Sequence, residues 1–367
     1  MNFFCKKENL LNGINIVQKG VSSKTTLPIL EGILIETIEN TIKLTSNDLE
    51  IGIECIIEAQ IKRKGASVVE SKMFGEIIRK LPDADIFISL EDNGIFIIEC
   101  EGSLYKLSSL NPDDFPRLPS IKADESVKIK QSTFKEMIKQ TIFAVSADEN
   151  RPIFTGCLVE ILDTYINMVA VDGFRLSLRR EECEWTGNKF YAVISGKTLN
   201  EIFKIIQTSE DDISINISKN QVLFEMDRCK IVSRLLEGEF LNYKSAIPVE
   251  KETRIRANKS NLLSAFERIY LITREEKKYP VKTKIENGIM TIICNSTIGN
   301  AKEELNIETE GKDIEIGFNP KYLIDALKAI NDEEINIDFT TSMAPCVIKP
   351  IEGETFVHMI LPVRIRE

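Results

Sequence analysis

The sequence predicts an α+β protein built from three tandem copies of one domain, each with two helices laid on antiparallel sheet. Two observations support this fold class. Similar segments recur about every 124 residues, and each copy alternates amphipathic helical segments with strand-like runs. A chain of 367 residues also exceeds the usual size of one domain. We expect the domains at residues 1–122, 123–249 and 250–367.

The repeat is clearest around the second helical segment of each copy. Lys72, Lys197 and Lys321 open runs of similar pattern and lie 125 and 124 residues apart. Asp48 in LTSNDLEIGIE and Asp172 in VAVDGFRLSLR form a further pair, separated by 124 residues. Chance likeness between amphipathic segments would not reproduce these landmarks in one register, so the copies are expected to share a topology.

Each copy is expected to run helix, strands, helix, strands. In FKEMIKQTIFAV the apolar residues recur every three or four positions from Phe134 to Val145, which indicates one buried helical face. The near-alternating runs on either side of Lys219 and Asn220 indicate a β-hairpin. The six predicted helices cover residues 6–24, 71–80, 131–144, 196–207, 258–278 and 319–330.

Composition excludes several classes of protein. No signal-peptide pattern follows the first residues, and no apolar run approaches the roughly 20 residues of a membrane span. We therefore expect a cytoplasmic protein with no membrane partner. The eight cysteines form no CxxC pair and no short metal-ligand spacing, which favours small buried residues in a reducing compartment. We expect neither a metal nor a cofactor.

Charge is distributed unevenly between the helices and the rest of the chain. The net charge is −10, yet the six predicted helices carry +10 and the remaining residues −20. This split suits a protein whose helices hold a polyanion through phosphate contacts that read no sequence. It would also arise if helix surfaces simply favour Lys and Arg while loops and strand edges collect acids. Charge alone leaves both interpretations open.

The residues themselves resemble the bacterial sliding clamp family, the β subunits of DNA polymerase III, over essentially the whole chain. The resemblance rests on the order and spacing of TTLPILEGILIE, LTSNDLEIGIE, SKMFGEIIRKLP, NPDDFPRLP, RPIFTGCLVE, AVDGFRLSL, LLEGEFLNY, IGFNPKYLIDAL and the terminal LPVRI. It implies a non-enzymatic, head-to-tail homodimer, a ring whose helices face a central hole. It also implies that the ring encircles duplex DNA without sequence specificity and tethers the replicative polymerase.

The resemblance further implies partners and a binding site for them. A clamp loader opens the ring, and the DNA polymerase III catalytic subunit, other polymerases and repair factors bind through short peptides. The peptides are expected in a pocket between the second and third domains, an apolar surface with a few polar anchors. The matching positions for this pocket are Phe154, Val171, Gly173, Phe174, Arg175, Leu176, Tyr322, Leu361, Pro362, Val363, Arg364 and Ile365.

Two more surfaces follow from the resemblance. DNA is expected to contact basic residues on the helices and adjacent loops. The dimer interface is expected to join a first-domain strand of one subunit to a third-domain helix of the other. Each of the basic residues, taken alone, is more often an ordinary solvated surface charge, and only as a group do they favour a DNA-facing surface. The DNA-facing set is Lys24, Lys72, Arg79, Lys80, Arg151 and Lys197. The dimer-interface set is Tyr105, Leu107, Leu271 and Ile272.

Alternative functions stay open at the level of sequence. An enzyme would need a catalytic constellation, but His358 is the only histidine and no GxxxxGK[ST] loop is present. A repeat-built scaffold that binds proteins but not DNA would explain the repeats and leave the basic helices unexplained. Val171, Phe174 and Leu241 depart from the residues common in the family, which bears on peptide preference and allows a divergent copy outside bulk replication.

Overall fold

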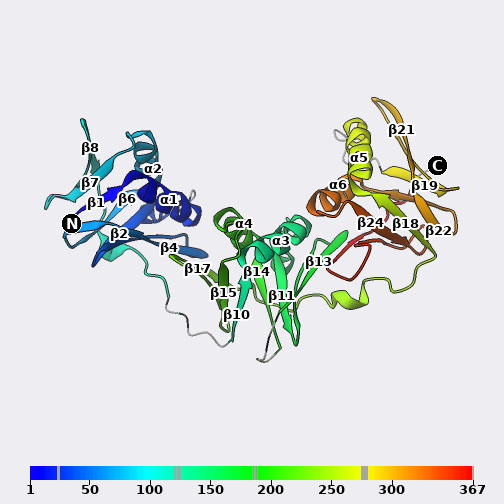
Figure 1. The fold of residues 1–367 in the computed structure, drawn as a ribbon, viewed down its shortest axis with the longest axis horizontal. Coiled ribbons are helices and arrows are strands. Elements are labelled where there is room, and N and C mark those ends of the chain that lie inside the picture. Colours follow the sequence, from blue (N-terminus) through cyan, green and yellow to red (C-terminus); the bar gives the residue numbers. More distant parts are fainter. Residues whose placement is uncertain are drawn as a thin grey trace. The chain divides into compact units, whose positions relative to one another are not determined.

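The computed structural model describes residues 1–22, 25–119, 121, 125–183, 185, 187, 189–273 and 280–365. Within these ranges the chain forms six α-helices, six short 3-10 helices and 26 β-strands (Figure 1). Over the same residues, no helix is both long and apolar enough to cross a bilayer. The α-helices are α1 (Lys7–Val17), α2 (Ser71–Lys80), α3 (Gln131–Thr141), α4 (Gly196–Ile205), α5 (Lys259–Thr273) and α6 (Pro320–Ala329).

The three repeats share one order of elements. Each begins with a strand and a helix, continues with at least four strands, and ends with a second helix and three strands. The first repeat runs from β1 to β9, the second from β10 to β17 and the third from β18 to β26. The short strands β5 and β22 are additions of the first and third repeats. The predicted α+β class with two helices in each copy is confirmed.

Two compact units divide the chain, and the first comprises Met1–Ser132 and Glu201–Leu235. It holds a five-stranded antiparallel sheet, β5-β1-β7-β8-β9, and an eight-stranded one, β10-β15-β16-β17-β4-β3-β2-β6. Helix α1 packs against α2, β3 and β4. The strands are β1 (Asn2–Lys6), β2 (Gly32–Ile38), β3 (Thr41–Asn47), β4 (Ile51–Glu58), β5 (Gln60–Arg63), β6 (Ala66–Glu70), β7 (Asp85–Leu90), β8 (Ile95–Cys100), β9 (Ser103–Ser108), β10 (Glu125–Lys130), β15 (Asp212–Ile217), β16 (Gln221–Met226) and β17 (Cys229–Arg234).

The second unit comprises Thr133–Asn200 and Leu236–Glu367. It holds a nine-stranded sheet, β14-β11-β12-β13-β26-β25-β24-β18-β22, and a four-stranded one, β21-β20-β19-β23. Helix α5 packs against α6, β20 and β21. The strands are β11 (Gly156–Leu162), β12 (Tyr165–Val171), β13 (Arg175–Glu182), β14 (Phe190–Ser195), β18 (Thr253–Asn258), β19 (Val281–Glu286), β20 (Ile289–Ser296), β21 (Gly299–Asn306), β22 (Glu308–Gly311), β23 (Ile314–Phe318), β24 (Glu334–Phe339), β25 (Cys346–Lys349) and β26 (Phe356–Ile360).

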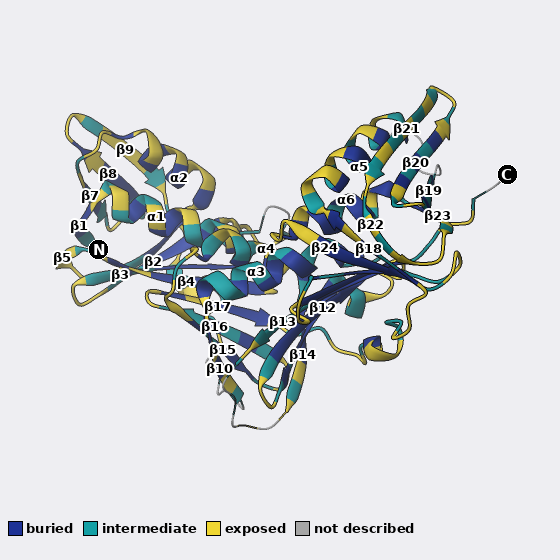
Figure 2. Ribbon diagram, turned by 45° about the vertical axis from the view of Figure 1, so that its right-hand side comes forward, coloured by how far each residue is buried: buried dark blue, intermediate teal, exposed yellow. Residues whose placement is uncertain are grey.

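The core of each unit lies where helices cover sheet. In Figure 2 the buried residues run along the sheet strands and the covered sides of the helices. Local sequence sets where the helices begin. The Glu70 carboxylate caps α2 by accepting the N–H groups of Lys72 and Met73, and Pro320 occupies the first turn of α6, where its missing N–H is not needed.

Antiparallel strand pairs join each repeat to the next inside both large sheets. We call β4·β17 the first seam and β13·β26 the second seam. In the first seam Ile51 pairs with Ser233, and in the second Arg175 pairs with Ile360. In both seams, therefore, the first residue of one strand lies opposite the fifth residue of the other.

The seams also share the phase of their hydrogen bonds. The Ile56 N–H donates to the Arg228 carbonyl at 2.9 Å, and the Arg180 N–H donates to the Thr355 carbonyl at 2.8 Å. Ile56 and Arg180 are the sixth residues of β4 and β13. The two seams are thus copies of one backbone arrangement.

Several predicted boundaries differ from the structure. The segment predicted as a helix over 6–24 forms α1 to Val17 and a 3-10 turn to Gly20. The strand that precedes each first helix was not predicted. Residues 274–278 of the fifth predicted helix lie outside the described residues. The hairpin at Lys219 and Asn220 is confirmed, because Ile217 and Val222 pair on either side of it.

The compact units do not follow the three repeats. Strands β10 and β15–β17 of the second repeat belong to the first unit, and β11–β14 belong to the second. The seams explain this division, since each one merges strands of neighbouring repeats into a single sheet. The domain boundaries near residues 122 and 249 stay a prediction.

Candidate functional site

A tight turn between β12 and β13 lies at the centre of the site. The Asp172 side chain accepts hydrogen bonds from the N–H groups of Phe174 at 2.9 Å and Arg175 at 3.1 Å. Gly173 has a φ of +93°, a left-handed conformation that favours glycine. The sequence AVDGFRL therefore forms a turn into a buried strand with Asp172 and Gly173 shaping it, as its residue types indicate.

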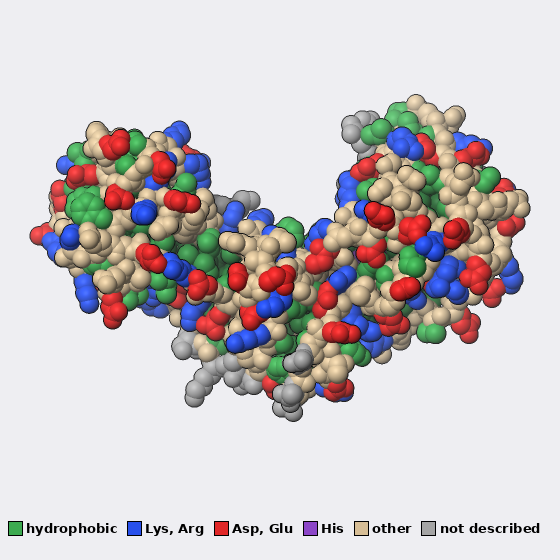
Figure 3. All heavy atoms as spheres, in the orientation of Figure 1, with side chains coloured by type: hydrophobic (Ala, Val, Ile, Leu, Met, Phe, Trp, Pro, Cys, Tyr) green, Lys and Arg blue, Asp and Glu red, His purple; other side chains and the backbone are tan. Residues whose placement is uncertain are grey.

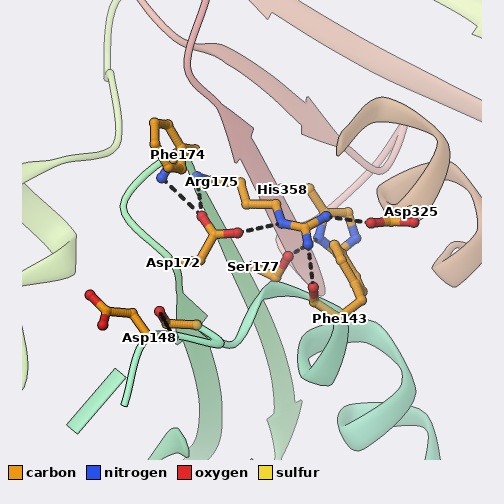
Figure 4. Close-up of polar contacts among 9 residues, drawn as sticks. Phe143, Asp148, Asp172, Phe174, Arg175, Ser177, Asp325 and His358 are labelled. Atoms are coloured by element: carbon orange, nitrogen blue, oxygen red, sulfur yellow. Dashed lines mark hydrogen bonds and ion pairs between the residues drawn. The ribbon is translucent and has the colours of Figure 1, made fainter. Parts of the chain in front are cut away.

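Arg175 fastens this turn to the elements around it (Figure 4). Its guanidinium donates from Nε to Asp172 at 2.9 Å, from Nη1 to Asp325 of α6 at 2.7 Å and from Nη2 to the Phe143 carbonyl at 2.6 Å. The same group lies over the rings of Phe143 and Tyr322, with distances of 5.3 Å and 4.6 Å to the centroids. With 8% of its surface exposed, Arg175 organises the site from within.

An apolar cluster lies on the nine-stranded sheet beside the turn. Val171 and Leu176 are buried in it, while Phe154 is half-buried and meets Phe240 edge-on, with 5.7 Å between ring centroids. We call this group the strand-end cluster. Its buried members are Leu158, Val169, Val171, Leu176, Leu178, Val193, Tyr243, Val347, Val357 and Met359, and its half-buried rim is Ile153, Phe154, Leu236, Phe240, Ala246 and Ile247.

An aromatic pair and the C-terminal segment lie on the other side of the turn. Phe174 is 59% exposed and stacks on Tyr322 of α6, with 6.1 Å between centroids. The Leu361 N–H donates to the Phe174 carbonyl at 2.9 Å, and the Val363 N–H donates to the Gly317 carbonyl at 2.8 Å. The segment after β26 therefore runs from the turn to β23. On the neighbouring helix, burial raises the pKa of the Tyr322 hydroxyl.

The structure thus brings the twelve predicted pocket residues into one unit but gives them different roles. Phe174, Val363 and Arg364 are exposed, whereas Leu176 and Arg175 are buried. The predicted pocket omitted the rim residues Leu236, Phe240, Ala246 and Ile247, although Leu236 and Phe240 lie in LLEGEFLNY, one of the segments that carries the family resemblance. Their apolar spacing in LEGEFLNYKSAI was the available signal.

Arg151 lies nearer to this site than its predicted role suggests. Its assignment to the DNA-facing set stays a prediction. Its guanidinium lies over the Phe154 ring at 5.8 Å and pairs with Asp148 at 3.2 Å. A Cβ on Gly173 would lie 4.0 Å from its terminal nitrogens. Arg151 is therefore a polar group at the edge of the strand-end cluster.

Four of the other predicted DNA-facing residues are exposed on helices. Lys72, Arg79 and Lys80 lie on α2, and Lys197 lies at the start of α4. Lys24 lies outside the described residues. With the observed boundaries, the six helices carry twelve Lys and Arg against six Asp and Glu. Charges of both signs are interspersed on the face drawn in Figure 3. The positive excess is a property of the helices, because the whole chain carries a net charge of −10.

Two of the four predicted dimer-interface residues lie on an edge strand of the five-stranded sheet, and the other two lie on a helix beside an edge strand of the four-stranded sheet. Tyr105, 41% exposed, and the half-buried Leu107 lie on the edge strand β9. Leu271, 60% exposed, and the half-buried Ile272 lie on α5, which packs against the edge strand β21. Leu271 also lines a groove of about 530 Å³ between α5 and α6.

The described residues present neither a cluster of metal ligands nor a histidine suited to proton transfer. No group of three or more His, Cys, Asp or Glu there could hold a metal ion. His358 is buried on β26, with Nδ1 3.1 Å from the Ser177 hydroxyl, and burial lowers its pKa to about 3. A histidine held neutral in this way supports packing and not proton transfer near neutral pH.

Three domain-family models match the chain in order. The N-terminal domain of the DNA polymerase III β subunit matches residues 1–119, the central domain residues 128–242 and the C-terminal domain residues 244–364. The chain belongs to the DNA polymerase III β subunit family, the β sliding clamps. The resemblance seen in the sequence is confirmed.

Relatives align over the full length. The β sliding clamp of Halalkalibacterium halodurans is 35% identical over 378 residues, which cover 99% of this chain and 100% of the relative. Crystal structures of the clamps from Bacillus subtilis and Streptococcus pyogenes are 34% and 30% identical, with TM-scores of 0.96 and 0.95 and complete coverage of both chains. The chain accordingly has the three-domain β-clamp fold, and its family role is that of a non-catalytic processivity factor of DNA polymerase III.

The pH dependence of stability provides a test of the His358 environment. The folded-state pKa near 3 lies below the ordinary value of 6.5, so between these values the unfolded chain binds the extra proton. His358 therefore destabilises the fold as pH falls through this window. In urea unfolding, His358→Asn should remove up to about 1.4 kcal/mol per pH unit of this loss. Ser177→Ala, which keeps the histidine, should retain it, and identical pH profiles for wild type and His358→Asn would contradict the assignment.

Proposed function

We propose that this chain closes a ring with a second copy of itself and that the ring slides on duplex DNA. The shared register of the two seams carries the proposal. Strands β4, β13 and β21 hold equivalent places in the three repeats, as do β17, β26 and β9. The seams use β4 with β17 and β13 with β26, which leaves β21 and β9 as sheet edges. Pairing β21 of one copy with β9 of another would form a third contact of the same kind and join the two copies head to tail.

The seam geometry supplies a register for this contact. If the first residue of β21 lies opposite the fifth of β9, Gly299 faces Leu107 and Ala301 faces Tyr105. Like Cys55 and Cys229 in the first seam, Ala301 and Tyr105 would be a non-hydrogen-bonded pair, whose side chains lie closest together. Because α5 covers β20 and β21, the exposed Leu271 would lie beside the new pair and bury apolar surface.

The basic helices fit a non-specific DNA surface. Lys72, Arg79 and Lys80 gather on α2 and Lys197 opens α4, whereas the chain as a whole carries a net charge of −10. Lysine and arginine on helices bind phosphates without reading bases, which suits a protein that must move along DNA. A protein-only scaffold would leave this separation of charge unexplained. Replication of DNA places such a protein in the bacterial cytoplasm.

The strand-end cluster supplies a docking surface for partners. Its half-buried rim, with Phe154 and Phe240, offers contacts for Leu or Phe side chains of an extended peptide. Phe174, Arg364 and Arg151 place exposed aromatic and charged groups nearby. We assign to this surface the peptides of the DNA polymerase III catalytic subunit, the clamp loader, and other polymerases and repair factors. A few buried side chains are expected to carry most of the affinity.

Cysteine cross-linking tests the proposed ring. Tyr105→Cys combined with Ala301→Cys should give a covalent dimer on mild oxidation, because non-hydrogen-bonded partners meet the distance requirement of a disulfide. Non-reducing electrophoresis would detect it. The matched control pairs Tyr105→Cys with Lys302→Cys, whose side chain points to the other face of β21. Equal cross-linking in both double variants, or none in the first, would contradict the register.

Charge reversal tests the DNA surface. Lys72→Glu, Arg79→Glu and Lys197→Glu together should shorten retention on nicked circular DNA after loading, since each replaces an attraction to phosphate with a repulsion. Unchanged thermal unfolding would show that the fold is intact. Reversal of Lys128 and Lys230, which are exposed on strands outside the proposed β21–β9 contact, is the control and should leave retention unaltered. Any direct DNA affinity should fall by about 0.9 in log units per phosphate contact for each tenfold rise in salt.

Deletion of residues 361–367 tests the docking surface. The truncated chain should lose binding of a Leu- and Phe-containing polymerase peptide, because the segment from Leu361 borders the turn at Phe174. Fluorescence anisotropy with a labelled peptide measures the loss, and sedimentation should still report the dimer. Phe240→Ala should weaken binding at least tenfold as well, whereas Leu241→Ala, on its exposed neighbour, should not. Full affinity in the truncated chain would refute the placement.

A further inference from the structure

Two cysteines lie directly opposite each other in the first seam. Cys55 of β4 pairs with Cys229 of β17, and their sulfur atoms are 3.3 Å apart. All eight cysteines lie in described parts of the chain and all are free thiols, but this is the pair whose sulfurs touch. The corresponding residues of the second seam are Arg179 and Phe356. The pair is therefore a feature of the first seam and not of the repeat.

The backbone at this position suits a disulfide. Because the Ile56 N–H donates to Arg228, the adjacent Cys55 and Cys229 form a non-hydrogen-bonded pair. Such pairs have Cα atoms about 4.5 Å apart, within the 4.4–6.8 Å range found for disulfides. Side-chain rotation that closes the sulfur gap by on the order of 1 Å would form the bond. The strands themselves need not separate or change register.

The two thiols differ in ways that suit a two-step exchange. Cys229 is 9% exposed and follows the Asp227–Arg228 turn, whereas Cys55 is 4% exposed and lies further inside the sheet. The contact with Cys55 lowers the pKa of Cys229, and the contact with Cys229 together with burial raises the pKa of Cys55. Opening of the short turn would expose Cys229 first, so Cys229 is the attacking thiol.

We propose that Cys55 and Cys229 are a redox modification site at which low-molecular-weight disulfides form an intramolecular disulfide across the first seam. The Cys229 thiolate attacks one sulfur of the small disulfide, breaks its S–S bond and releases one thiolate, which takes up a proton. Cys55 then loses its proton, attacks the Cys229 sulfur and releases the second thiolate. The two protein thiols are oxidised to one disulfide, and the small disulfide is reduced to two thiols.

Oxidation would lock the junction between the first and second repeats. The bond would span 174 residues of sequence and join β4 to β17, the strands through which the two repeats share a sheet. Opening of this strand pair would then require reduction. Amide hydrogen exchange along β17 should slow in the oxidised protein and recover on reduction.

The test uses the full chain and oxidised glutathione. Thiol titration after denaturation should fall from eight to six, and non-reducing peptide mapping should find Cys55 linked to Cys229. Dithiothreitol should restore all eight thiols. Cys55→Ser should instead accumulate glutathione on Cys229, because no thiol remains to resolve the adduct. Cys229→Ser should form neither product and should lose thiols at least tenfold more slowly.

A matched control separates this site from general oxidation. Cys157→Ser removes a buried cysteine of the second unit, whose sulfur lies 4.0 Å from the Thr141 hydroxyl, and should leave the rate of Cys55–Cys229 linkage unchanged. Circular dichroism would check that all three variants are folded. Glutathione on the more exposed Cys183 without any Cys55–Cys229 link would overturn the proposal. So would equal loss of two thiols in the wild type and in Cys229→Ser.

Discussion

The strand pairing that forms the two seams is the constraint on which the rest of this structure depends. Side chains alternate between the faces of a sheet, so a slip of one residue would turn every buried side chain of a seam strand toward solvent. Ile51 and Ile53 of β4 and Ile231 of β17 are almost completely buried, which fixes the register of the first seam. The second seam follows the same rule, and the two seams join strands of neighbouring repeats into the two large sheets.

The candidate site is a product of the second seam. Pairing of β13 with β26 places Leu176 opposite Met359 and brings the segment after β26 beside Phe174. Arg175 then links the turn to α6 through Asp325 and, through Phe143, to the 3-10 helix Ile142–Ala144 that follows α3. Removing this arginine would leave the Asp172 and Asp325 carboxylates without their charged partner. Arg175 therefore stabilises the shape of the surface whether or not a ligand is bound.

Much of this arrangement was accessible from sequence. The near-constant spacing of Lys72, Lys197 and Lys321 predicted three copies, and amphipathic periodicity located all six helices. The seams were not predictable, because strand partners distant in sequence are chosen by packing and not by local propensity. For the same reason, the contact of Arg175 with Asp325, 150 residues away, had no local signal. Lysine exposure on α2 was foreseeable, since charges follow the helical face opposite the buried one.

A shared backbone geometry also creates a problem of discrimination. If the proposed β21–β9 contact keeps the register of the two seams, three strands of one kind and three of another pair with the same spacing, and the hydrogen bonds alone do not distinguish a correct partner from a domain-swapped one. Side chains at matching points must do so. Cys55 with Cys229 and Arg179 with Phe356 give the two seams different sizes and charges at the same position. In the proposed β21–β9 contact, Glu303, held by Arg268, would occupy the equivalent place. Different side chains at these equivalent positions therefore disfavour pairing with the wrong strand. The same differences make the repeat harder to recognise in the sequence.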